Sequence, residues 1–311
     1  MRSYRNFKLT ESRLDFIKFE KSEYHLVKLT LYTILISQNV KLKNIILLFI
    51  ICSCKVFAAN IENFPVYSKS MSKNIPNQII IPNTYNNSSE RFPVLYLLHG
   101  AGDNYLGWLQ IAPELPNYAD QYKIIIVCAD GGETSWYFDS PIDRNMWYET
   151  YISAELVSAI DNKYRTRTNK NGRAIAGLSM GGHGAFYLAF RHQNIYGAAG
   201  SISGAMDIRP FQNQWDLTKR LGNYSTHQSN WDNNTIVNMA ALLQGKSLQL
   251  IFDCGTSDFF ISYNRQLHHE LLRRKIPHEY SERPGEHSAA YWHDSIKNQL
   301  PFFSAFFNKS K

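Results

Sequence analysis

Cysteine is scarce in this chain, which has four cysteines in 311 residues. Cys52 and Cys54 lie near the N-terminus, whereas Cys128 and Cys254 each end an expected strand. No Cys or His spacing matches a metal site, and none is predicted. We expect the two strands not to be neighbours in a sheet, so Cys128 and Cys254 are predicted to be buried free thiols.

Residues 60–311 also lack an excess of positive charge. The whole sequence has 33 Lys and Arg against 26 Asp and Glu, but residues 60–311 hold 23 basic and 22 acidic side chains. The basic balance therefore belongs to the leader, and a nucleic acid partner is not indicated. Internal repeats are absent too, and the 252 residues after position 59 suit one α/β domain with a full core.

Residues 40–59 have the features of a secretory signal peptide. Lys41 and Lys43 precede the apolar run 45–51, which is too short for a comfortable membrane span, and small residues follow at Ala58 and Ala59. We therefore expect a secreted or periplasmic protein whose folded domain is residues 60–311.

The position of this leader leaves three interpretations open, because the apolar run begins some 40 residues after Met1. Translation from a non-AUG codon at Val40 would make residues 1–39 an artefactual or disordered extension. A genuine extension would instead keep the apolar run as a membrane anchor. Ile51-Cys52-Ser53-Cys54 also resembles a bacterial lipoprotein box, with Cys54 as the lipid acceptor. Contact with a membrane is expected only in the last two cases.

Gly177-Leu178-Ser179-Met180-Gly181-Gly182 is the most informative stretch of the chain. It follows the apolar run 173–176 and leads into the helical pattern 184–190. Strand, sharp turn and helix in this order predict a nucleophile elbow. Such a turn exposes the Ser179 hydroxyl at a helix N-terminus, where backbone N–H groups favour developing negative charge.

A serine nucleophile needs a base, and the base needs an orienting acid. The buried strand predicted at 247–252 is followed by two candidate acids. Asp258 comes after a glycine turn and opens the next helical pattern, whereas Asp253 remains at the strand end and can tie down the turn. We favour Asp258 as the orienting acid.

The chain has ten histidines from which to choose the base. His287 lies in the loop between the final strand and the final helix, from which it can reach back over the sheet. A solvated or packed imidazole is expected at six others, which fall in helical patterns or before an edge-like strand: His183, His192, His268, His269, His278 and His293. His287 is therefore the predicted base.

Four motifs together resemble one known family. They are Leu97-Leu98-His99-Gly100, the elbow at 177–182, Cys254-Gly255-Thr256-Ser257-Asp258 and Gly285-Glu286-His287. They are similar to an esterase family of α/β-hydrolases that includes feruloyl and acetyl-xylan esterases, tributyrin-type esterases, S-formylglutathione hydrolases and mycolyltransferases. The resemblance runs from about Val66 to Phe306. Family members often have two glycines before the histidine, whereas the second is Glu286 here.

The resemblance implies an α/β-hydrolase fold, a doubly wound, mostly parallel sheet with helices on both faces. It implies a serine carboxylic-ester hydrolase that needs no cofactor. The backbone N–H groups of Ala101 and Met180 are expected to form its oxyanion hole, and His99 to brace the loop that carries Ala101. An acyltransferase of the mycolyltransferase type and a thioesterase like S-formylglutathione hydrolase remain alternatives.

Aromatic side chains between residues 135 and 149 suggest what such an enzyme would bind. Some of them must belong to the core, but Trp136 follows a Gly-rich loop near the active face and is expected to form a pocket wall for sugars or aromatic acyl groups. Glu149 is expected to be structural. The Asn-rich segment 205–246 is predicted to be an insertion beside the site. The expected substrate is therefore an acetyl or feruloyl ester of a carbohydrate, small or polymeric.

Overall fold

The computed structural model describes residues 59–243 and 248–309. The expectations for the leader, including lipidation of Cys54, lie outside these residues. Among the helices of the two described ranges, none has the length and hydrophobicity that crossing a membrane requires.

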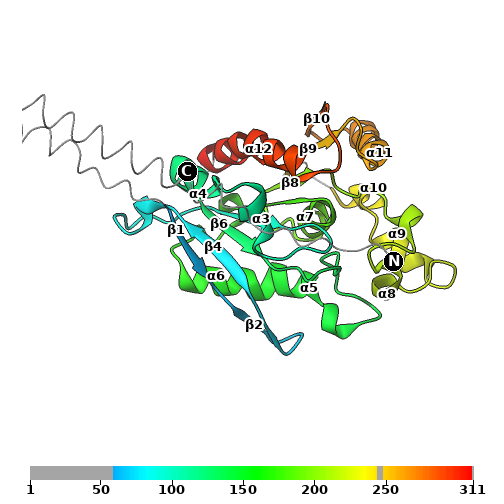
Figure 1. Cartoon of the computed structure of the whole chain (residues 1–311), viewed down its shortest axis with the longest axis horizontal. Coiled ribbons are helices and arrows are strands. Elements are labelled where there is room, and N and C mark those ends of the chain that lie inside the picture. The colour runs from blue at the N-terminus through cyan, green and yellow to red at the C-terminus, as the bar shows by residue number, and fades with distance from the viewer. Residues whose placement is uncertain (1–58, 244–247, 310–311) are drawn as a thin grey trace, which may run out of the picture. The chain divides into compact units, whose positions relative to one another are not determined.

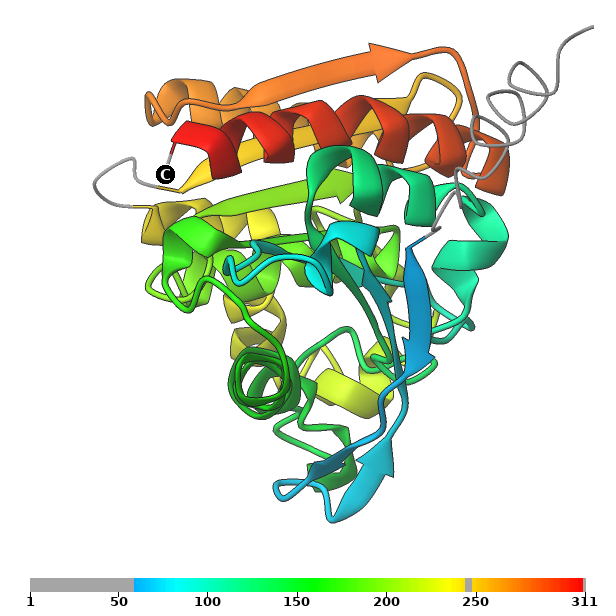
Figure 2. The same cartoon turned by 90° about the vertical axis from the view of Figure 1, so that its left-hand side faces the viewer.

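Eight strands form the central sheet. They are β1 Asn60–Asn63, β4 Asn77–Ile81, β5 Val94–Leu98, β6 Ile125–Ala129, β7 Arg173–Leu178, β8 Ala198–Ile202, β9 Gln249–Gly255 and β10 Glu279–Arg283. Their order is β1-β4-β6-β5-β7-β8-β9-β10. All pairs from β6 to β10 are parallel, and β1 and β4 add antiparallel pairs at one edge. Figure 2 shows β10 at the opposite edge.

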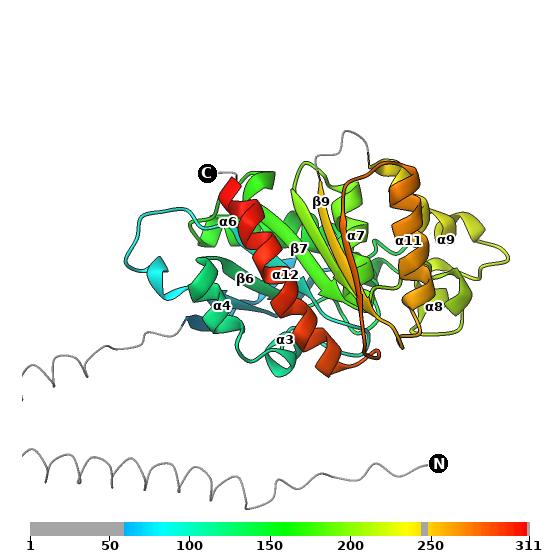
Figure 3. The same ribbon diagram turned by 90° about the horizontal axis from the view of Figure 1, so that it is seen from above.

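Helices cover both faces of this sheet (Figure 1). One face carries α3 Gly107–Ile111, α4 Leu115–Tyr122 and α12 Ala289–Lys309, which crosses the sheet in Figure 3. The other carries α5 Tyr148–Thr150, the π-helical turn η3 Tyr151–Leu156, α6 Val157–Lys163, α7 Met180–Arg191, α10 Ile236–Met239 and α11 Ile261–Arg273. The expected doubly wound α/β-hydrolase fold is confirmed.

The remaining described elements are short. They are β2 Val66–Ser68 and β3 Lys73–Ile75, which pair with each other, the helices α8 Leu217–Leu221 and α9 Gln228–Asn233, and the 3-10 turns η1 Asn83–Tyr85, η2 Arg144–Met146, η4 Lys170–Gly172, η5 Arg209–Phe211 and η6 Ala240–Leu242. Five described elements lie between β8 and β9, in chain order η5, α8, α9, α10 and η6. That segment is the insertion predicted at 205–246.

Burial on both faces explains why β5 is a continuous apolar run. Val94, Tyr96 and Leu98 belong to the core on the α7 side, and Leu95 and Leu97 belong to the core under α12. A strand covered by helices on both faces needs apolar side chains at every position, not at alternate ones. Such a run is therefore typical of a central parallel strand.

The two cysteines of the described domain do not pair. Cys128 on β6 and Cys254 on β9 are buried free thiols, as expected, and β5, β7 and β8 lie between their strands. Burial raises the pKa of the Cys128 thiol to about 12, so this side chain stays protonated near neutral pH.

Candidate active site

Ser179 occupies a strained turn between β7 and α7, with φ 53° and ψ −117°. L-residues rarely adopt such angles, and these outliers often mark functional sites. Glycine at position 181 permits the turn, because a Cβ atom there would lie 2.3 Å from the carbonyl oxygen of Leu98. The helix therefore starts directly against the end of β5, and the half-buried Ser179 lies at the carboxyl edge of the central strands.

His287 connects Ser179 to Asp258. Its Nε2 lies 2.9 Å from Ser179 Oγ, and its Nδ1 lies 2.9 Å from Asp258 Oδ2. Because a carboxylate only accepts hydrogen bonds, Nδ1 carries the proton and the Ser179 hydroxyl donates to Nε2. The backbone N–H of Phe260 donates to the other Asp258 oxygen at 2.8 Å and fixes the carboxylate. The three residues predicted from separate motifs thus form one hydrogen-bonded chain.

The loops that carry Asp258 and His287 are joined through their backbones. The N–H of Ser257 donates to the Gly285 carbonyl at 2.9 Å. Gly285 has φ 152°, and a Cβ atom on Gly255 would lie 2.4 Å from its carbonyl oxygen. Glycine at both positions therefore allows the close crossing that sets the distance between acid and base. The neighbouring Glu286 is exposed.

Asp253 has a different set of partners from Asp258. Its buried carboxylate accepts hydrogen bonds from the Ser295 hydroxyl at 2.7 Å and the Gln299 amide at 2.8 Å, both on α12. Arg283 donates to it at 3.2 Å. Asp253 therefore fastens α12 to β9, and the acid that meets His287 is Asp258, as the sequence predicted.

The loop after β5 lies against Ser179. A Cβ atom on Gly100 would lie 3.5 Å from the Cβ of Ser179, and Ala101 follows directly. Met180 is the first residue of α7, where a backbone N–H has no partner within the helix. Ala101 and Met180 thus both lie close to Ser179. The role of their backbone N–H groups as oxyanion donors stays a prediction.

His99 braces this loop, as expected. Its Nδ1–H donates to the Gly100 carbonyl at 2.8 Å, and its Nε2 accepts from the Gly131 N–H at 2.9 Å. Burial lowers the pKa of His99, and the neutral ring is the form that can accept at Nε2. The hydroxyl of Tyr137 donates to the His99 carbonyl at 3.0 Å.

The prediction that Trp136 forms a pocket wall is wrong. This side chain is 1% exposed and belongs to the core, and its backbone has φ 59°, which few non-glycine residues adopt. The ring packs 5.4 Å from His183, and its N–H donates to the Trp215 carbonyl at 3.0 Å. Trp136 supports the insertion and does not form an accessible pocket wall.

An exposed aromatic side chain does lie next to the base. Phe259 is 52% exposed, and its ring centroid lies 4.4 Å from that of His287. Its position directly after Asp258 was the signal in the sequence that could have pointed to it, because a residue next to the acid can lie near the base. Phe259 was not among the residues predicted from the sequence.

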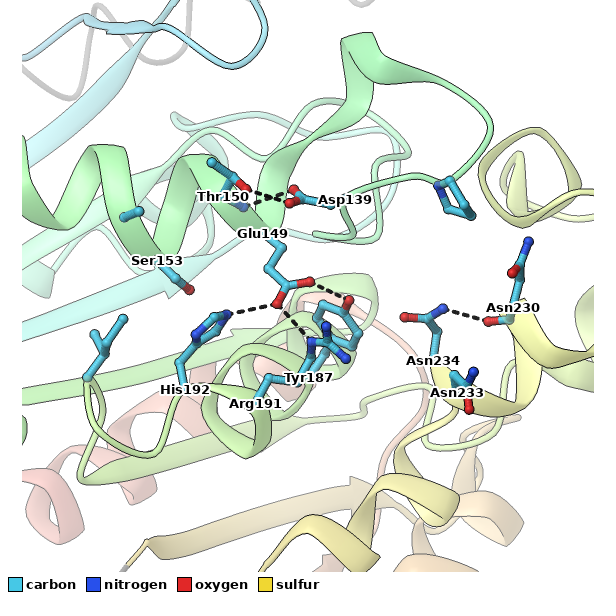
Figure 4. A pocket seen from close by; sticks show the side chains of 13 residues that line it. Asp139, Glu149, Thr150, Ser153, Tyr187, Arg191, His192, Asn230, Asn233 and Asn234 are labelled. Carbon is cyan, nitrogen blue, oxygen red and sulfur yellow. Dashed lines mark hydrogen bonds and ion pairs between the residues drawn. The ribbon is translucent and has the colours of Figure 1, made fainter.

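A cavity of about 530 Å³ lies away from these residues, at the C-terminal end of α7 (Figure 4). Glu149 on its wall accepts hydrogen bonds from Tyr187, Arg191 and His192 at 2.6 to 2.8 Å. Burial opposes ionisation, but the hydrogen bonds outweigh it and lower the pKa of Glu149 to about 2. This carboxylate joins α5 to α7, which is the structural role expected for it.

No group of three or more His, Cys, Asp or Glu side chains in residues 59–243 and 248–309 has an arrangement that could hold a metal ion. The chemistry that the described residues offer is that of a hydroxyl whose proton can pass to an imidazole held by a buried carboxylate.

Comparison with known proteins identifies relatives of the whole described domain. The family model described as "Putative esterase" matches residues 68–303. An esterase of Mycobacterium tuberculosis is 30% identical in an alignment 246 residues long, and the match covers 67% of this chain and 51% of the relative. The chain thus spans about half the length of that relative. An acetyl esterase of Caldicellulosiruptor saccharolyticus is 24% identical over 263 residues, 76% of this chain and 96% of the relative.

Solved structures share the fold. A ferulic acid esterase superposes with a TM-score of 0.69 at 26% identity, over 80% of this chain and all of that chain.

Replacement of the two acids should separate their roles. Asp258→Asn should lower kcat/KM for an activated ester by about a hundredfold or more, because an amide cannot stabilise the imidazolium. Asp253→Asn should change kcat/KM far less. It should lower the free energy of unfolding by about 1–3 kcal/mol, since charged hydrogen bonds to α12 are lost. Ester kinetics and thermal unfolding measure both effects, and a larger kinetic loss for Asp253→Asn would contradict the assignment.

Proposed function

The chain belongs to this esterase family, and on that premise we propose that it cleaves carboxylic esters through an acyl-enzyme formed on Ser179. One observation carries the proposal. The hydroxyl of Ser179, at the tip of a strained turn, donates to an imidazole whose opposite nitrogen donates to the buried carboxylate of Asp258.

The proposed reaction has two halves. Ser179 Oγ attacks the ester carbonyl carbon while its proton passes to His287 Nε2, and Asp258 stabilises the resulting imidazolium. The negative charge on the former carbonyl oxygen is held by the N–H groups of Ala101 and Met180. His287 then gives the proton to the departing alcohol oxygen. Water repeats the attack on the acyl-enzyme, with His287 again as base, and releases the acid and the free serine.

We assign the substrate to acyl groups, acetyl or feruloyl, that are esterified to carbohydrate. Relatives named acetyl esterase and ferulic acid esterase support this choice. A secreted location agrees with it, because the leader resembles a signal peptide and residues 60–311 are near neutral in charge. Transfer of the acyl group to a sugar hydroxyl, as in a mycolyltransferase, would use the same residues, and product analysis with an added sugar acceptor distinguishes transfer from hydrolysis.

Removing the nucleophile should abolish turnover without unfolding the protein. Ser179→Ala should lower kcat by roughly 10⁴- to 10⁶-fold, because the residues that act as a unit leave little activity when one is lost. Steady-state kinetics measure the loss, and circular dichroism checks the fold. A variant that keeps more than a few per cent of wild-type activity would remove Ser179 from the mechanism.

Substrate preference gives a second test. We expect a higher kcat/KM on an acetylated or feruloylated xylan fragment than on a long-chain triglyceride, since the proposed substrate is a carbohydrate ester. Parallel assays of both substrates at one pH provide the comparison. Faster cleavage of the triglyceride would indicate a general lipid esterase.

The leader gives a third test. A chain that starts at position 40, with Met in place of Val40, should be exported and cleaved near Ala58 or Ala59. N-terminal sequencing of the mature protein, expressed from the full gene, gives the result. A mature protein that still carries residues 1–39 would contradict a start at Val40.

A further inference from the structure

Two aromatic side chains form a wall beside His287. Phe259 follows the orienting acid, and Trp215 comes from the insertion between β8 and β9. Their rings are nearly parallel, at an interplanar angle of 18° and a centroid distance of 6.2 Å. Phe259 also lies 4.4 Å from the His287 ring and is half exposed. We call this pair the Trp215–Phe259 wall.

The surrounding structure fixes Trp215 in an unfavourable backbone conformation. Trp215 and Asp216 have φ of 46° and 57°, a region that costs non-glycine residues energy and that clusters at functional sites. The Trp215 carbonyl accepts from the Trp136 indole N–H at 3.0 Å, and the Asp216 carboxylate accepts from the Thr134 hydroxyl at 3.0 Å. Two hydrogen bonds from the loop after β6 thus fasten residues 215 and 216, which carry the indole beside Phe259.

The wall is aromatic on its inner side as well. The ring centroid of Phe211 lies 5.6 Å from that of Trp215. The ring centroid of Phe260 lies 4.5 Å from that of Phe259 and 5.3 Å from that of His287. Aromatic rings therefore also lie on the side of the wall that faces the core. Such a surface suits a flat, partly apolar ligand such as the face of a sugar ring or an aryl group.

We propose that the Trp215–Phe259 wall binds the alcohol portion of the ester, the part that leaves first. This inference rests on the proposed function. His287 Nε2 must come within hydrogen-bond distance of the departing oxygen in order to protonate it. The group attached to that oxygen therefore lies beside the imidazole. Among the described aromatic side chains whose rings neighbour the imidazole, Phe259 is exposed, whereas Phe260 is buried and Trp292 is partly buried. The carbonyl oxygen points instead toward the amides of Ala101 and Met180.

Esters that share one acyl group but differ in their alcohol test whether the wall binds the alcohol portion. All acetates give the same acetyl-enzyme on Ser179, so its hydrolysis cannot depend on the alcohol that has left. Phe259→Ala should lower kcat/KM by roughly tenfold for an acetylated xyloside, which loses its stacking surface. It should change kcat/KM by less than about threefold for methyl acetate, whose alcohol is too small to reach the wall.

The deacylation rate separates the two roles of Phe259. A structural role in supporting His287 would change this rate, whereas a role in binding the alcohol would not. We expect the steady-state rate after the burst with 4-nitrophenyl acetate to be unchanged in Phe259→Ala, and Phe259→Tyr to restore the xyloside activity. Tyr67→Ala removes an equally exposed aromatic side chain from β2 and should leave all rates unchanged. Trp215→Phe, which keeps a ring, should show a smaller loss than Phe259→Ala.

Three outcomes would overturn the inference while leaving the esterase function intact. An equal loss for every acetate, with slower deacylation, would make Phe259 a support for His287. A loss for methyl ferulate but not for the acetylated xyloside would place the acyl group on the wall. No loss for any ester would leave the wall without a substrate role. Failure of the wild-type protein to hydrolyse any ester would instead refute the proposed function.

Discussion

The site depends on the close approach of α7 to the ends of β5 and β7. A Cβ atom on Gly177 would lie 2.2 Å from the Gly181 carbonyl oxygen, and one on Gly181 would lie 2.3 Å from the Leu98 carbonyl oxygen. Any larger residue would push the helix away from the sheet. Ser179 would then lose the strained turn that directs its hydroxyl toward His287, and the first amide of α7 would move away from the loop after β5.

Most of the sheet and the hydrogen-bonded chain could be predicted because their signals are local. Strands buried on both faces are apolar throughout, and the site residues follow strands whose carboxyl ends meet at one edge. The directions in which the aromatic side chains point could not be predicted from such local signals. Trp136 is buried and Trp215 contributes to the wall, and both have positive φ, a conformation that neither residue type favours and that the sequence does not indicate. The edge strand β1 and the β2–β3 ribbon are short and polar, and they gave no periodic signal.

Hydrogen-bond partners distinguish the structural polar side chains from the site. Asp253 and Glu149 each accept bonds from fixed neighbours that join one element to another. His99 uses both ring nitrogens on backbone groups of two loops. His287 differs, because its Nε2 meets the hydroxyl of a half-buried serine. The proton of the Ser179 hydroxyl can therefore pass to His287 during a reaction without breaking a contact on which the fold depends.

Direct observation of the acyl-enzyme tests the central claim. Acid quenching during turnover of an activated acetate, followed by mass spectrometry of proteolytic peptides, reports which residue carries the acetyl group. The account predicts one acetyl group on the peptide that contains Ser179, formed in the burst and absent from the His287→Ala protein at the same time point. Rapid turnover with no acetylated Ser179, or with the acetyl group on another residue, would contradict the account.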